Sequence, residues 1–164
     1  MRMQVRTGSA EETREVGEAI ASLLRVRDAV VLTGELGAGK TTFVQGVARG
    51  LGIEEQVNSP TFTLVKEYSG ILDLAHVDVY RLDRIQDVVD LGLDELGGGD
   101  DVLMVEWGDT IEELLPDDRL RVELTPDDAA GVDARAIVFT CTGGGWADRF
   151  PELEAAMLPW AVSA

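Results

Sequence analysis

One glycine-rich segment restricts the possible folds of this chain more than any other feature. Residues Gly34–Thr41, with the sequence GELGAGKT, match the P-loop pattern of a glycine, four residues of any type and then Gly-Lys-Ser/Thr. The apolar run Ala29–Leu32 before this segment is typical of a buried parallel strand. After it, Thr41–Leu51 carries apolar residues at helical spacing. A strand, a glycine-rich turn and a helix in this order predict an α/β fold.

The residues of this segment suit the binding of phosphate groups. Phosphate oxygens need several hydrogen-bond donors at short range, and small residues let consecutive backbone amides converge on them. The positive end of the following helix adds to this attraction. We expect the ammonium group of Lys40 to lie against the β- and γ-phosphates and the hydroxyl group of Thr41 to bind Mg²⁺. The candidate phosphate-binding residues are Gly34, Glu35, Leu36, Gly37, Ala38, Gly39, Lys40, Thr41 and Thr42.

The rest of the chain continues the alternation of strands and helices. Its 164 residues fit one domain that spans residues 1–164. We predict a P-loop NTPase-like three-layer sandwich, in which a central, mostly parallel sheet with some antiparallel strands carries helices on both faces. Ser9, three residues before Glu12, marks the start of a helix. Further strands are expected at Met3–Arg6, Thr61–Val65, Leu72–Tyr80, Val102–Val105, Arg119–Leu124 and Ala136–Cys141, and further helices at Ala10–Arg25 and after Gly145.

The chain is strongly acidic. Its 31 Asp and Glu residues stand against 14 Lys and Arg, for a formal net charge of −17, and such a field repels phosphate backbones and anionic lipid surfaces. We therefore expect neither strong direct binding of nucleic acid nor binding to a membrane. The sequence shows no signal peptide and no apolar stretch long enough to span a bilayer. The single cysteine, Cys141, is interpreted as a small buried strand residue, and its isolation fits a reducing cytoplasm.

Two acidic residues at predicted strand ends are candidates for binding a metal ion or orienting water. Glu106 closes the apolar run Val102–Val105, so its carboxylate is expected at the carboxyl edge of the sheet, where ligands bind in such folds. Asp78 shares one face of a predicted strand with His76 and could also reach the metal ion or the water. The alternatives are a surface position for Glu106 and, for Asp78, a buried ion pair with a residue such as Arg81.

Three further features are compatible with more than one interpretation. Asn58–Thr63 carries hydroxyl groups that could sense a γ-phosphate, although Ser59-Pro60 is equally typical of a turn. His76, the only histidine, is interpreted as a packing residue. Trp107 could pack beside a nucleotide or fill the edge of the core.

The sequence favours ATP over GTP and hydrolysis over phosphate transfer to a metabolite. Neither Lys40 nor Lys66 stands in the Asn/Thr-Lys-x-Asp pattern that recognises guanine. A small-molecule kinase needs basic residues to clamp the transferred phosphate, whereas the connection Asp83–Asp101 has seven acidic residues and one basic residue. The main alternative to an ATPase is a nucleotide-dependent binding module in which slow hydrolysis serves as a timer, and a small-molecule kinase is the third possibility.

Four blocks of the sequence resemble the TsaE (YjeE) family in their order and separation, and the resemblance covers almost the whole chain. The P-loop block is shared by many families. The Ser-Pro-Thr-aromatic-Thr and His-x-Asp-x-Tyr-Arg blocks are specific to this one. The four blocks are Leu32–Thr42, Ser59–Val65, His76–Leu82 and Val105–Trp107.

The resemblance implies a bacterial cytoplasmic ATPase required for the threonylcarbamoyladenosine (t6A) modification at position 37 of tRNAs that read codons beginning with adenine. In that family the protein acts with TsaB and with TsaD, the threonylcarbamoyl transferase. ATP hydrolysis supports repeated turnovers of this complex.

The resemblance also implies roles for individual residues. By matching motif, Gly34–Thr42 would hold the phosphates of ATP, and Thr41 and Glu106 would hold Mg²⁺. Asp78 would assist hydrolysis, so that Lys40, Asp78 and Glu106 are the catalytic candidates. Two more residues follow from the resemblance, namely Thr61 in a switch-like segment and Arg135, which looks similar to a nucleotide-contacting arginine.

Overall fold

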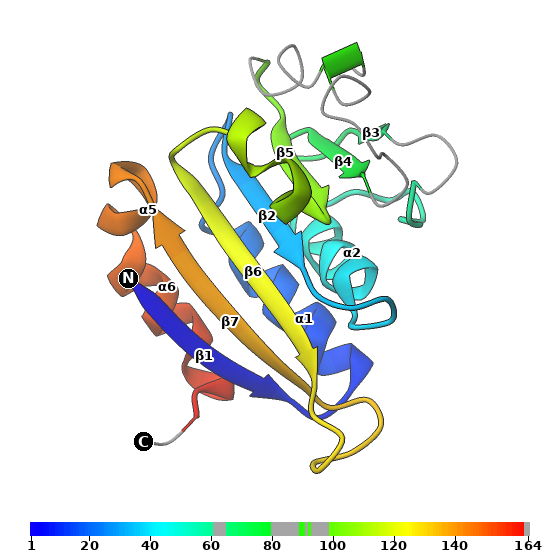
Figure 1. The fold of residues 1–164 in the computed structure, drawn as a ribbon, viewed down its shortest axis with the longest axis vertical. Helices are drawn as coiled ribbons and strands as arrows, with labels where there is room; N and C mark the ends of the chain where they lie inside the picture. The colour runs from blue at the N-terminus through cyan, green and yellow to red at the C-terminus, as the bar shows by residue number, and fades with distance from the viewer. Residues whose placement is uncertain (61–64, 80–88, 91, 93–98, 163–164) are drawn as a thin grey trace.

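The central feature of the fold is a seven-stranded mixed sheet (Figure 1). The computed structural model describes residues 1–60, 65–79, 89–90, 92 and 99–162. Within them the strands are β1 (Arg2–Thr7), β2 (Ala29–Thr33), β3 (Val65–Tyr68), β4 (Leu74–Asp78), β5 (Val102–Glu106), β6 (Arg119–Pro126) and β7 (Arg135–Thr142). Their order across the sheet is β1-β7-β6-β2-β5-β4-β3.

Most strands of this mixed sheet run in the same direction. β4, β5, β2 and β6 pair in parallel. β3 pairs antiparallel with β4, and β7 pairs antiparallel with both β6 and β1. Only β3 and β7 therefore oppose the common direction among the described strands. The prediction of a mostly parallel sheet with some antiparallel strands is confirmed.

Helices cover the two faces of this sheet unequally. α1 (Ala10–Ala21), α2 (Lys40–Gly50) and α6 (Phe150–Met157) lie on one face (Figure 1), and α6 continues from the short α5 (Gly144–Asp148). The 3₁₀ helix η1 (Gly108–Leu114) lies on the opposite face. No helix within the described residues is both long and apolar enough to cross a lipid bilayer.

Two hydrophobic clusters, one on each face, explain why β2 is buried at every position and apolar from Ala29 to Leu32. Val30 and Leu32 pack against α1 and α2 in the larger cluster, whereas Val31 packs with Ile111 of η1 in the smaller one. Side chains alternate between the two faces of a strand, so a strand covered on both sides needs apolar residues throughout. The apolar run before the glycine-rich turn thus has the origin that the sequence predicts.

Helix α1 ends earlier than the predicted range Ala10–Arg25. Its last residue is Ala21, and the chain then turns toward β2. The carboxylate of Asp28 holds this turn, because it accepts a hydrogen bond from the amide of Arg25 at 2.7 Å. The same carboxylate forms a buried two-point ion pair with Arg149, at 2.6 and 2.7 Å. A contact with the distant C-terminal helices therefore overrides the helical spacing of residues 22–25.

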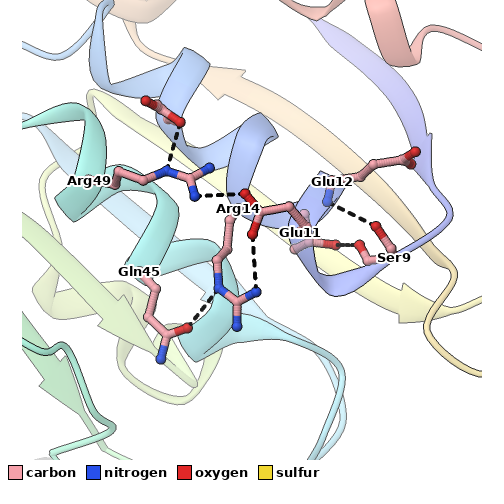
Figure 2. Close-up of polar contacts among 8 residues, drawn as sticks. Ser9, Glu11, Glu12, Arg14, Gln45 and Arg49 are labelled. Atoms are coloured by element: carbon pink, nitrogen blue, oxygen red, sulfur yellow. Dashed lines mark hydrogen bonds and ion pairs between the residues drawn. The ribbon is translucent and has the colours of Figure 1, made fainter.

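Helices α1 and α2 pack with their backbones in direct contact. A Cβ atom on Gly46 would overlap the carbonyl group of Arg14, so only glycine fits this crossing. Exposed and half-buried polar side chains join the same two helices beside the crossing (Figure 2). The start of α1 is as predicted, because the Ser9 hydroxyl accepts a hydrogen bond from the amide of Glu12 at 3.1 Å.

Cys141 is buried in β7, as predicted, and burial raises the pKa of its thiol. Since the thiolate is the reactive species, we expect iodoacetamide to modify Cys141 at least about tenfold more slowly in the folded chain than in urea. Mass spectrometry of timed samples measures both rates. Equal rates with and without denaturant would contradict the buried position.

Candidate functional site

The glycine-rich turn joins the end of β2 to the start of α2. Gly34, Gly37 and Gly39 all have positive φ angles, of 142°, 80° and 101°, which residues with a Cβ atom rarely adopt. A side chain on Gly34 would also overlap the carbonyl oxygen of Leu124 in β6. Among the described residues no side chain caps the first turn of α2, so its amides face the turn. This arrangement is suited to binding an anion.

Lys40, the first residue of α2, is buried and points back into the turn. Its ammonium group donates hydrogen bonds to the carbonyl oxygens of Gly34 at 2.7 Å and Glu35 at 2.9 Å. It also lies 3.8 Å from the centre of the Trp107 ring, where the face of an indole attracts a cation. Trp107 contacts the smaller hydrophobic cluster as well, so both of its predicted roles, at the site and at the core edge, are compatible with its position.

Asp78 and Glu106 lie side by side at the carboxyl ends of two parallel strands. They are direct partners in the register of β4 and β5, and both side chains are buried. The surface position considered for Glu106 is therefore wrong. The ion pair considered between Asp78 and Arg81 stays a prediction, because Arg81 lies outside the described residues. Thr61, predicted to lie in a switch-like segment, is outside them too.

Two hydroxyl groups connect these acids to the turn and to the segment after α2. The Thr41 hydroxyl donates to Glu106 Oε1 at 3.0 Å. The Ser59 hydroxyl lies 2.9 Å from Asp78 Oδ2 and 3.5 Å from Glu106 Oε2. The structure thus brings together Thr41 and the two acids, as the sequence predicts, and adds Ser59, whose sequence context is equally typical of a simple turn.

His76 of β4 contacts one of these two acids, Glu106. It is fully buried, and its Nε2 atom lies 3.1 Å from Glu106 Oε2. Its Nδ1 atom has no hydrogen-bond partner among the described residues. The sequence indicated that His76 and Asp78 share a face of one strand. It did not reveal the contact with Glu106, because that contact depends on β5 lying beside β4.

A cavity of about 400 Å³ opens between the turn and the acids. Its side-chain oxygen atoms come from three hydroxyl groups and two carboxylates, which are ligands that Mg²⁺ accepts. No group of three or more acidic, histidine or cysteine residues able to hold a metal ion is found in the described part of the chain. The cavity is lined by Leu36, Gly37, Gly39, Lys40, Thr41, Thr42, Ser59, Asp78, Glu106 and Trp107.

Arg135, at the start of β7, reaches the turn from another direction. Its guanidinium group donates to the carbonyl oxygens of Ala38 at 2.9 Å and Gly37 at 3.2 Å. It is not among the residues that line the cavity beside the acids. The structure therefore places Arg135 against the backbone of the glycine-rich turn, while the predicted contact with a nucleotide stays a prediction.

Comparison with known proteins identifies the family of this chain. Residues 7–137 match the family model described as "Threonylcarbamoyl adenosine biosynthesis protein TsaE". The chain belongs to the TsaE family. The resemblance seen in the four sequence blocks is thereby confirmed, and all four blocks and Arg135 lie within the matched residues. The TsaE family takes part in the synthesis of t6A in tRNA.

Individual TsaE relatives match this chain over most of their own length. One from Bacillus subtilis is 48% identical over 139 residues, which cover 84% of this chain and 85% of the relative. One from Streptomyces coelicolor is 43% identical over 141 residues, which cover 82% of this chain and 93% of the relative. The crystal structure of Bacillus subtilis YdiB superposes with a TM-score of 0.81 at 40% identity, over 94% of this chain and 95% of that one. The P-loop NTPase-like fold is confirmed by this likeness.

Proposed function

We propose that this TsaE-family chain is a magnesium-dependent ATPase that acts with TsaB and TsaD in the cytoplasm to support t6A synthesis at position 37 of tRNAs reading codons that begin with adenine. The observation that carries the proposal is the hydrogen bond of 3.0 Å between Thr41 and Glu106. It joins the phosphate-binding turn to a buried acid on a neighbouring strand, as ATP hydrolysis with a bound metal ion requires.

Five side chains of the cavity, together with the backbone of the turn, have a role in this proposal. The backbone amides of Gly34–Thr42 and the start of α2 hold the phosphates. Lys40 exchanges its contacts with the turn's own carbonyl oxygens for contacts with the β- and γ-phosphates. Thr41 and Glu106 hold Mg²⁺, which neutralises charge that develops on the phosphates. Asp78, with Ser59 on its carboxylate, orients the attacking water.

The acidic charge of the chain agrees with a helper role. A net charge of −17 opposes a direct grip on tRNA, whose phosphates attract basic surfaces. In the proposal the partner proteins hold the tRNA, and this chain binds to a basic face of one partner in an ATP-dependent manner. Charge complementarity of this kind speeds association and selects the partner.

The experiment is a measurement of t6A in tRNA after the protein is depleted from a bacterium. We expect t6A to fall, to recover with the unaltered chain, and to stay low with a Lys40→Ala chain, which loses the cation that contacts the phosphates. Mass spectrometry of digested tRNA gives the t6A content. A full recovery with Lys40→Ala, at matched protein levels, would show that nucleotide binding at this turn is not the function.

A further inference from the structure

One polar contact links the phosphate-binding helix to the segment that carries Ser59. Gln45 lies one turn after Thr41 on the same side of α2, since residues four apart share a helix face. Its side-chain amide donates a hydrogen bond to the carbonyl oxygen of Val57 at 2.9 Å. Val57 is buried in the larger hydrophobic cluster, and Ser59 follows two residues later. The helix that begins with the phosphate-binding residues therefore also holds the backbone next to Ser59.

The Gln45 amide is itself held in place from α1. Its oxygen accepts a hydrogen bond from Arg14 Nε at 3.2 Å (Figure 2). The backbone of Arg14 cannot shift easily, because its carbonyl group abuts Gly46 at the helix crossing. With its oxygen bound to Arg14 and its nitrogen bound to Val57, the amide has one orientation that satisfies both partners.

The helix pair around this contact is further joined by ion pairs. Glu11 of α1 accepts from Arg49 of α2 at 2.7 Å, and Arg49 also donates to Glu18 of α1 at 2.8 Å, whereas the contact of Glu11 with Arg14 at 3.5 Å lies within α1 (Figure 2). The hydrogen bond from Arg49 lowers the pKa of Glu11, so Glu11 stays ionised to a lower pH than an unpaired glutamate does. Such exposed pairs add little stability singly. The two ion pairs of Arg49 join the two helices and do not involve Val57, so Arg49 can be replaced without removing the contact between Gln45 and Val57.

We propose that Gln45 is a positioning residue for ATP hydrolysis, which fixes the backbone at Val57 so that the Ser59 hydroxyl stays on Asp78 and within reach of Glu106. This inference rests on the proposed function. It assigns Gln45 no contact with ATP or the metal ion. Reaction rates respond strongly to the placement of groups near the reacting atoms, and small shifts from a distant change can cost 10- to 100-fold.

Gln45→Glu is the sharpest test, because it keeps the size of the side chain and the acceptor for Arg14 but loses the donor to Val57. We expect kcat for ATP to fall about tenfold, with KM for ATP within about twofold of the unaltered chain, because the phosphate-binding turn is intact. In a Ser59→Ala background the same substitution should cause no further loss, since its effect passes through Ser59. Gln45→Met, which loses both contacts, should lower kcat and spare KM as Gln45→Glu does.

Arg49→Met is the matched control, since it breaks two ion pairs of the same helix pair and leaves the contact between Gln45 and Val57. It should leave kcat unchanged. Amide hydrogen exchange gives a second measurement that needs no turnover, and exchange at Asn58 and Ser59 should rise in Gln45→Glu but not in Arg49→Met. An unchanged kcat in Gln45→Glu overturns this inference alone. Absence of ATP turnover by the unaltered chain with its partners overturns the proposed function and this inference together.

Discussion

Replacing Glu106 with glutamine is expected to lower Mg-dependent ATP turnover by at least about 100-fold while ATP still binds. The amide keeps nearly the same shape and still accepts a hydrogen bond from Thr41, which lies 3.0 Å from the carboxylate. It lacks the negative charge that binds Mg²⁺ in the proposed function. Because the phosphate-binding turn is unchanged, affinity for the nucleotide should fall much less than kcat. Steady-state kinetics and equilibrium binding of a fluorescent ATP analogue measure the two quantities.

Glu154→Gln is the control for this substitution, since Glu154 is exposed on α6 and far along the chain from the site. It should leave both kcat and binding unchanged. The same two chains distinguish hydrolysis from a simple binding function. If Glu106→Gln binds ATP but supports normal t6A levels in cells, hydrolysis is not what the modification requires, and the chain acts as a nucleotide-dependent binding module.

Replacing Gly46 with alanine is expected to destabilise the chain by about 3 kcal/mol, because the new methyl group would overlap the backbone of Arg14. Alanine favours a helix over glycine by about 1 kcal/mol, which offsets only part of that cost. In a chain of this size a destabilisation of about 3 kcal/mol corresponds to a fall in Tm of about 10 °C. Thermal unfolding followed by circular dichroism measures it.

Gly144→Ala provides the comparison for this prediction. Gly144 lies at the start of α5 and has open space where a Cβ atom would go. The same chemical change there should alter Tm by no more than a few degrees. If the two variants unfold at the same temperature, the close approach of α1 and α2 is not as tight as the structure indicates.

Part of the site could be predicted because its signals are local. The P-loop pattern of Gly34–Thr41 depends on neighbouring residues, and so does the apolar run that ends at Glu106. Asp78 was identified by its place in a short alternating strand. In each case the sequence predicted which residue belongs to the site and at which edge of the sheet it lies, since parallel strands end together.

Other parts could not be predicted because they depend on which segments become neighbours. The contact of His76 with Glu106 joins residues 30 positions apart, and it requires β4 to pair with β5. The position of Arg135 against the carbonyl groups of Gly37 and Ala38 joins positions almost 100 residues apart. The early end of α1 reflects the ion pair of Asp28 with Arg149. In each of these contacts, the sequence around one residue carries no pattern that indicates its distant partner.

The sequence alone therefore determined that this chain has a glycine-rich P-loop-type turn between a buried strand and a helix, because glycine positions, apolar runs and helical spacing act over a few neighbouring residues. Only the tertiary structure decided that Ser59 contacts Asp78 and Glu106, that His76 contacts Glu106, and that Gln45 connects α2 to the segment before Ser59. These contacts arise when the order of strands in the sheet and the crossing of two helices bring distant residues within hydrogen-bonding distance. Their energies depend on distances that the order of residues along the chain does not specify.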